Sequence, residues 1–251
     1  MNKIRWLLCL LAWLTAAPAL AETLTVAVAP NVKFAFDDLQ AEFKKESGID
    51  LKPVYAASGA LTAQIVNGAP FDVFVSADMG FPEEVFKSGF ATAPPKQYAS
   101  GILVLWTTKD LDLSNWKALL ADKRVEKIAV PNPKTAPYGR EALKLLTHLK
   151  LDETLKSKLV YAESINQSAT YVLTGVVDVG FNAKSVAVSK EMQGKGKWVG
   201  IREAPVEPIA QGAVILKHGR ENAPAAAKKF FDFLYSPKAR AIFAAHGYLL
   251  P

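Results

Sequence analysis

The chain has 251 residues, of which 50% are hydrophobic and 22% are charged, and its formal net charge is +6. This ordinary globular composition excludes a collagen-like, a coiled-coil or an intrinsically disordered chain. The basic residues are spread out, with no Lys/Arg-rich run that has interleaved aromatic residues, so nothing indicates nucleic-acid binding. The length allows one large domain or two lobes, each able to bury a core.

The N-terminus has the pattern of a secretory signal peptide. Lys3 and Arg5 precede an apolar run over residues 6–14, which is shorter than the roughly 20 residues that span a bilayer. Residues 19–21 (ALA) fit the small-x-small cleavage pattern. We therefore predict a signal peptide at residues 1–21 rather than a buried N-terminal helix.

Cysteine usage agrees with export without disulfide bonds. Cys9 is the single cysteine of the chain, and it lies inside the apolar run rather than at its end, which argues against a lipoprotein anchor. Cleavage would remove Cys9 and exclude a disulfide framework. It would also lower the net charge by two, because Lys3 and Arg5 are lost.

Beyond the signal peptide, short apolar strands alternate with helical patterns. In the first half the expected elements are a strand at 24–29, a helix at 32–47, a strand at 49–55, a helix leading from 57–59 to 67–68, a strand at 71–76, a short helix at 83–87 and a strand at 102–107. In the second half they are a helix at 113–121, a strand at 127–130, a helix at 139–149, a strand at 159–162, a helix at 168–174, a strand at 176–181, a helix at 183–192, a strand at 209–216, and helices at 224–235 and 237–246. This βαβ order predicts parallel sheets with right-handed crossovers.

The order of elements predicts an α/β protein with two lobes, each a mostly parallel sheet flanked by helices. We assign residues 22–101 plus 213–251 to lobe I and residues 102–212 to lobe II. The strands near 102–106 and 210–215 are the candidate crossings between the lobes, and a ligand would lie in the cleft between them.

Polar residues follow several strands, at the edge where open α/β sheets bind ligands. These residues are Asn31, Ser58, Tyr138, the loop 164–166 and Asn182. Each position joins a strand to a helix N-terminus, whose unpaired N–H groups and partial positive charge favour an anion. The loops around Asn31 and Ser58 contain no charged residue, so we expect neutral donors that hold a proton-free tetrahedral dianion. Plain N-capping alone would explain residues such as Asn31 and Ser58 in most proteins, and a buried tyrosine that anchors its hydroxyl is at least as common as one that binds a ligand at a position like Tyr138.

Four stretches resemble the periplasmic molybdate-binding proteins of ABC importers: LTVAVAPN (24–31), VYAASGALTAQIVNGAPFDVFVSAD (54–78), VPNPKTAPYG (130–139) and AAHGYLLP (244–251). The likeness runs from Thr23 to Pro251, and residues 64–78 are its most specific part. The resemblance implies a two-lobed periplasmic binding protein of the type II class that closes on molybdate or tungstate. It also implies delivery to a permease at the inner membrane by a periplasmic monomer with no cofactor, no cation site and no catalytic activity.

Carried over to this chain, the resemblance implies ligand donors at Asn31, Ser58 and Tyr138 and a backbone contact at Ile165. Many members have serine at the first position, but a subgroup has asparagine and shares the APYG stretch. Two positions depart from the pattern. Asn182 stands where many members carry a tyrosine, so Tyr138 would supply that hydroxyl, and Pro30 has no N–H to donate.

Two other functions are weighed against this one. A binding protein for another tetrahedral oxyanion, such as sulfate, would share the fold and the neutral donors, and the size of the cavity would decide. A secreted hydrolase is the enzyme alternative, but the chain has no G-x-S-x-G and no H-E-x-x-H motif. His148, His218 and His246 lie near the ends of expected elements and have the positions of surface or capping residues.

We expect the mature protein to begin at Glu22 and to be found in the periplasm, because cleavage should follow residues 19–21. N-terminal sequencing of protein from the periplasmic fraction checks this. An intact Met1 in that material would contradict it.

Overall fold

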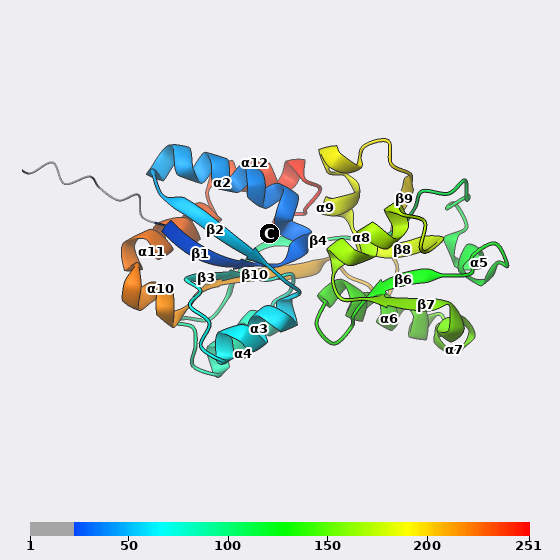
Figure 1. Cartoon of the computed structure of the whole chain (residues 1–251), viewed down its shortest axis with the longest axis horizontal. Helices are drawn as coiled ribbons and strands as arrows, with labels where there is room; N and C mark the ends of the chain where they lie inside the picture. The colour runs from blue at the N-terminus through cyan, green and yellow to red at the C-terminus, as the bar shows by residue number, and fades with distance from the viewer. Residues whose placement is uncertain (1–22) are drawn as a thin grey trace, which may run out of the picture.

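The computed structural model describes residues 23–251 and contains two five-stranded sheets that lie side by side, each between layers of helices (Figure 1). The predicted signal peptide lies outside the described residues. Within residues 23–251, no helix is both long enough and apolar enough to cross a membrane.

The first sheet has the strand order β2-β1-β3-β10-β4. Its strands are β1 (Thr23–Val28), β2 (Asp50–Tyr55), β3 (Val73–Val75), β4 (Lys96–Gly101) and β10 (Ile209–Ile215). β1 pairs in parallel with both β2 and β3, whereas β10 is antiparallel to β3 and to β4. Four of the five strands therefore run in one direction, and β10 opposes them.

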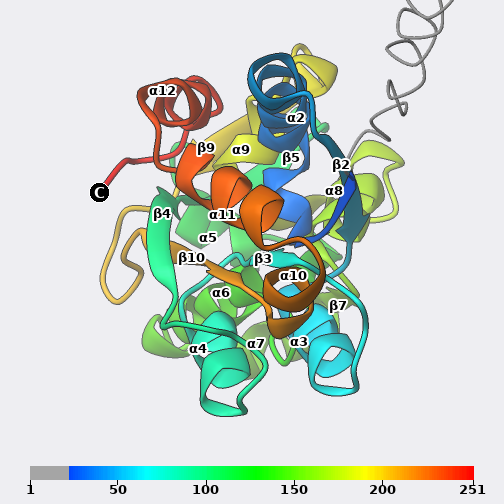
Figure 2. The ribbon, with the colours of Figure 1, turned by 90° about the vertical axis from the view of Figure 1, so that its left-hand side faces the viewer.

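Helices cover both faces of the first sheet, as Figure 2 shows. They are α2 (Lys33–Ser47), preceded by the 3-10 turn η2 (Pro30–Val32), then α3 (Ser58–Val66), α4 (Gly80–Lys87), α10 (Lys217–Asn222), α11 (Pro224–Phe233) and α12 (Pro237–Ala245). The alternation along β1 explains the two faces. Val26 and Val28 share a buried cluster with residues of α2, α11 and α12, whereas Ala27 between them belongs to a cluster with residues of α3.

The second sheet repeats this arrangement, with the order β7-β6-β8-β5-β9. Its strands are β5 (Leu103–Thr107), β6 (Ile128–Pro131), β7 (Leu159–Ala162), β8 (Val179–Ala183) and β9 (Lys197–Gly200). β6 pairs in parallel with β7 and β8, and β5 is antiparallel to β8 and β9. Its helices are α5 (Trp116–Ala121), α6 (Pro137–His148), α7 (Asp152–Leu155), α8 (Ile165–Leu173) and α9 (Lys184–Ala187), with the 3-10 turns η3 (Lys156–Lys158) and η4 (Lys190–Met192).

The predicted fold class, two α/β sheets flanked by helices, is confirmed, but several elements differ from expectation. The expected strand at 102–107 is β5 alone, and β4 precedes it as a separate strand in the other sheet. The expected helix at 183–192 is interrupted between α9 and η4, and β9, α7 and α10 were not expected. The division into 22–101 plus 213–251 and 102–212 stays a prediction, and β10 begins before its second boundary.

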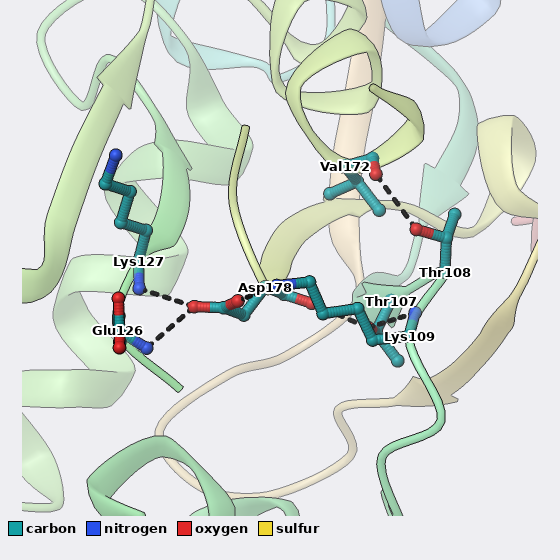
Figure 3. Close-up of polar contacts among 7 residues, drawn as sticks. All are labelled: Thr107, Thr108, Lys109, Glu126, Lys127, Val172 and Asp178. Atoms are coloured by element: carbon teal, nitrogen blue, oxygen red, sulfur yellow. Dashed lines mark hydrogen bonds and ion pairs between the residues drawn. The ribbon is translucent and has the colours of Figure 1, made fainter. Parts of the chain in front are cut away.

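A buried aspartate precedes the third strand of each sheet, Asp72 before β3 and Asp178 before β8. Asp178 Oδ2 accepts hydrogen bonds from the backbone N–H groups of Glu126, at 2.7 Å, and Lys127, at 2.8 Å, and Oδ1 pairs with Lys109 (Figure 3). Asp72 likewise accepts from the backbone N–H of Thr25, at 2.7 Å. In both sheets, therefore, a carboxylate fixes the chain at the start of a neighbouring strand.

The ionised form of Asp178 is favoured in the folded protein. Burial opposes its ionisation, but the hydrogen bonds from Lys109 and from the two backbone N–H groups outweigh burial and hold the pKa of Asp178 below its ordinary value. Because the folded-state pKa is lowered, the stabilisation is present above the unfolded-state pKa and is lost as the pH falls through the folded-state pKa.

We expect Asp178→Asn to lower the free energy of unfolding by about 1.5–3 kcal/mol at neutral pH, because it removes charge-assisted hydrogen bonds from a buried site. The difference from the parent should shrink in acid, as protonation removes the same charge from the parent. Urea unfolding at several pH values checks both points. Asp110→Asn is the matched control, since the Asp110 side chain is 99% exposed and its loss should change stability by less than about 0.5 kcal/mol. Equal effects of the two changes would contradict the role of Asp178.

Candidate functional site

One small cavity lies between the sheets, and the helical segments η2, α3, α6 and α8 begin around it. The lining residues are Ala29, Pro30, Asn31, Ala57, Ser58, Ala77, Ala136, Pro137, Tyr138 and Ile165. None of these described residues carries a charged side chain. The space free of atoms is about 210 Å³, compared with about 750 Å³ in a pocket near Ile102 that is lined mainly by apolar side chains, with Arg202, Glu203 and Glu207.

The structure brings all four predicted site residues to this cavity. Asn31 and Ser58 come from segments that follow strands of the first sheet, and Tyr138 and Ile165 follow strands of the second. All four are at most 4% exposed. Their contact with a ligand stays a prediction, but their convergence from both sheets gives it a geometric basis.

The plain N-cap interpretation of Asn31 and Ser58 is wrong. The residues at the two cap positions are Ala29 and Ala57, and neither helix start has a side-chain cap hydrogen bond. Asn31 lies inside the η2 turn and Ser58 is the first residue of α3. Neither the Asn31 nor the Ser58 side chain is therefore used to cap its helix, and both can make other hydrogen bonds.

Ser58 and Tyr138 have the same hydrogen-bonding pattern. Ser58 Oγ accepts from the backbone N–H of Ala77, at 3.0 Å, and Tyr138 Oη accepts from Gln211 Nε2, at 2.9 Å. Each hydroxyl thus keeps its single proton for a further acceptor. Burial raises the pKa of Tyr138 well above its ordinary value, so this hydroxyl stays protonated at neutral pH.

The amide of Asn31, expected to be a donor, is engaged within the protein. Its Nδ2 donates to Gln211 Oε1, at 2.9 Å, and to Tyr248 Oη, at 3.1 Å, while its Oδ1 is buried without a partner. The neighbouring N–H of Val32 already donates to the carbonyl of Ala29, at 3.0 Å. The donor that Asn31 can direct at a ligand is therefore its backbone N–H, in the first turn of a helix.

Ile165 is the first residue of α8, whose opening N–H groups have no partner inside the helix. Asn182 holds this helix start, because its Nδ2 donates to the carbonyl of Ile165, at 3.2 Å, and its Oδ1 accepts from the N–H of Ala183, at 2.9 Å. Asn182 is not among the described residues that line the cavity. It therefore supports the Ile165 loop and does not take the place of a tyrosine in the cavity.

Three buried residues behind the cavity were missed by the sequence analysis, namely Gln211, Tyr98 and Tyr248. Gln211 interrupts the apolar strand β10, and a lone polar residue in such a strand was an available signal. Tyr248 lies in the quoted stretch AAHGYLLP, which suggested a family likeness but no role. Tyr98 lies in β4, a strand that was not expected at all.

Contacts outside the cavity connect the two halves of the site. Arg140 of α6 forms an ion pair with Asp78, which follows β3, and its guanidinium lies 5.7 Å from the centre of the Phe81 ring. The N–H of Gly59 in α3 donates to the carbonyl of Thr135, at 2.9 Å. The charged side chains of this region therefore pair with each other beside the cavity rather than facing it.

In the part of the chain that the structure describes, the histidines and acidic residues form no cluster that could hold a metal ion. His218 pairs with Asp72, at 2.8 Å, and His246 pairs with Asp38, at 2.7 Å. Within residues 23–251 no group of three or more His, Cys, Asp or Glu is placed to hold a metal ion. The chemistry available at the cavity is hydrogen-bond donation to a small acceptor-rich ligand.

Comparison with known proteins extends over almost the whole chain. Residues 24–249 match the family described as bacterial extracellular solute-binding protein. The molybdate-binding protein ModA of Azotobacter vinelandii is 38% identical, over 97% of this chain and 96% of its own length. The molybdate-binding protein ModA of Rhodobacter capsulatus is 37% identical, over 93% of this chain and 91% of its own length. The solved structure of the periplasmic molybdate-binding protein of A. vinelandii superposes with a TM-score of 0.85, covering 91% of this chain and 99% of its own.

We expect Gly59→Ala to hold the two lobes apart. A Cβ at position 59 would lie 2.9 Å from the Cα of Thr135 and 2.9 Å from the Phe81 ring, and the backbone of Thr135 cannot rotate away. Small-angle X-ray scattering should therefore show a larger radius of gyration than in the parent. Gly200→Ala is the control, because its nearest neighbour would be a methyl group of Ile102 at 4.0 Å. An unchanged radius for Gly59→Ala would refute the close approach.

Proposed function

Because the chain belongs to the bacterial extracellular solute-binding proteins, we propose that it captures molybdate in the periplasm and delivers it to an ABC permease at the inner membrane. Relatives that carry the name molybdate-binding protein align with almost its whole length. The same likeness supports a binding protein without catalytic activity and without a cofactor besides its ligand.

The observation that carries this proposal is a cavity lined by buried, neutral residues that can present several hydrogen-bond donors. The Ser58 and Tyr138 hydroxyls each keep a proton, and the N–H groups of Asn31 and Ile165 open helical segments. The unpaired acceptor atom among the described lining side chains is Asn31 Oδ1. Converging helix N-termini and neutral donors favour a fully ionised oxyanion.

The size and charge of the cavity narrow the class of ligand. Ligand pockets for organic molecules usually have volumes of about 300–1,000 Å³, whereas the space that a water-sized sphere can occupy in this cavity is about 10 Å³. A ligand such as hydrogen phosphate would bring a proton that needs an acceptor. The cavity has no carboxylate, and its unpaired side-chain acceptor is Asn31 Oδ1, a neutral amide oxygen that accepts more weakly than a carboxylate. We therefore propose that the ligand is a proton-free tetrahedral dianion, bound by Ser58, Tyr138, Asn31 and Ile165.

Tungstate has the same charge and shape as molybdate, so we propose that it binds as well. Sulfate has the same charge but is smaller, and a smaller ion would leave some of the fixed donors unpaired. Sulfate binding is the second candidate function, since neutral donors alone would suit it.

Titration of the ligand-free protein with molybdate, tungstate, sulfate and phosphate tests the proposal. Molybdate and tungstate should raise the melting temperature by mass action, because they bind the folded state. Sulfate and phosphate at the same concentration should raise it much less. Equal shifts with molybdate and sulfate would make the protein a general oxyanion binder.

We expect Tyr138→Phe and Ser58→Ala each to weaken molybdate binding by about 1.5–3 kcal/mol, the usual contribution of a hydrogen bond to a charged group. This corresponds to roughly a tenfold to hundredfold or greater rise in Kd, at about 1.4 kcal/mol per decade. Tyr138→Phe also leaves Gln211 Nε2 without its acceptor and should lower the ligand-free stability by about 1–3 kcal/mol.

Isothermal titration calorimetry measures the affinities, and Tyr161→Phe serves as the control because the Tyr161 side chain is 53% exposed. The control should bind molybdate as the parent does. Parent-like affinity in both site variants would place the ligand on other loops.

A further inference from the structure

We propose that Gln211 is a positioning residue that directs the hydroxyl proton of Tyr138 into the cavity. Gln211 is fully buried on β10 and does not line the cavity, so it can act on a ligand only through its neighbours. The inference rests on the proposed function, because the ligand supplies the acceptor for that proton.

The directions of the hydrogen bonds are set by a backbone carbonyl. The carbonyl oxygen of Asn31 lies 2.7 Å from Tyr248 Oη, and a carbonyl can only accept, so Tyr248 must donate. With its proton used, Tyr248 Oη can only accept a second bond. The Asn31 side-chain atom 3.1 Å from it is therefore the donor Nδ2.

The orientation of Asn31 fixes the orientation of Gln211. The same Nδ2 lies 2.9 Å from the Gln211 amide, which must present its acceptor Oε1 there. Tyr98 Oη also lies 2.8 Å from Oε1, and 2.8 Å from the carbonyl of Ser76, so its one proton serves one of two acceptors. Gln211 is thus left with its donor Nε2 on the side of Tyr138.

The orientation of Gln211 fixes the direction of the Tyr138 proton. Gln211 Nε2 donates to Tyr138 Oη, at 2.9 Å, so the Tyr138 proton cannot point back at Gln211. Gly101 allows this contact, because a Cβ at position 101 would overlap both the Tyr138 hydroxyl and the Gln211 amide. Tyr138 lines the cavity, and the free direction of its O–H is toward that cavity.

Gln211→Glu tests the inference with almost no change in side-chain shape. An ionised carboxylate can only accept, so the Tyr138 proton would turn toward it and away from molybdate. Burial raises the pKa of the new carboxyl, and its protonated form can again donate to Tyr138. We expect molybdate affinity to fall by about tenfold or more at pH 8, as for loss of a hydrogen bond to a charged group, and to recover in part toward pH 6.

The three tyrosines around position 211 keep their protons between pH 6 and pH 8. Burial raises the pKa of Tyr98, Tyr138 and Tyr248 above the ordinary value of 10.0. Asp78 and Arg140, which lie beside the cavity, form an ion pair with each other. The parent should therefore bind molybdate with little change between pH 6 and pH 8, and a pH profile of Gln211→Glu parallel to that of the parent would overturn the inference.

A second comparison separates proton direction from simple charge repulsion by the new carboxylate. Gln211→Glu and the uncharged Gln211→Met are each measured with Tyr138 present and in a Tyr138→Phe background. If Gln211 acts through the Tyr138 proton, both changes should cost much less affinity in the Tyr138→Phe background. Additive losses would overturn the inference, and ligand-free melting curves show that each variant is folded.

Molybdate binding by the parent protein shows whether the proposed function or only the role of Gln211 is wrong. No response of the parent to molybdate would overturn the proposed function, and the positioning role would fall with it. Molybdate binding by the parent together with additive losses would overturn the role of Gln211 alone.

Discussion

A hydroxyl group has one proton and can therefore donate only one hydrogen bond. The hydrogen bonds that the cavity can offer depend on where each hydroxyl directs that proton. Ser58 and Tyr138 can offer that proton to a ligand because a second group, the Ala77 N–H or the Gln211 amide, already satisfies the oxygen from inside the protein. Neutral donors hold an anion only when they cannot turn away, since a freely rotating hydroxyl would also find partners within the protein. The buried groups behind the cavity are thus as important as the groups that line it.

Residues that follow strands of both sheets line the cavity, and close contacts bring the two halves together. The side chain of Gln211, on a strand of the first sheet, reaches Tyr138 in a helix of the second, and Ser185 Oγ donates to the carbonyl of Asn31, at 2.9 Å. Charges in this region, Asp78 and Arg140, neutralise each other beside the cavity. The described residues that line the cavity consequently carry no fixed charge, and an anion bound there as proposed would be stabilised by oriented dipoles.

The strongly periodic elements could be predicted from the sequence, among them β1, α2 and α6, because apolar residues at fixed spacing mark a buried face. The edge strands β4 and β9 could not, since their residues alternate weakly and their pairing depends on partners distant in sequence. At the site, strand ends and the family likeness indicated Asn31, Ser58, Tyr138 and Ile165, which all line the cavity. They did not indicate Gln211, because its proposed role depends on contacts with Asn31 and Tyr138, which lie 180 and 73 positions away.

The position of β10 between β3 and β4 affects the order in which the first sheet can fold. β4 lies at the edge of the first sheet, with β10 as its sheet neighbour and a further bridge from Ser100 to Leu249. Both partners come from the last part of the chain, so the first sheet stays incomplete until more than 100 residues after β4 have been synthesised or translocated. Such long-range pairing is slow to form. The C-terminal segment therefore adds Gln211 and Tyr248 behind the cavity late in folding.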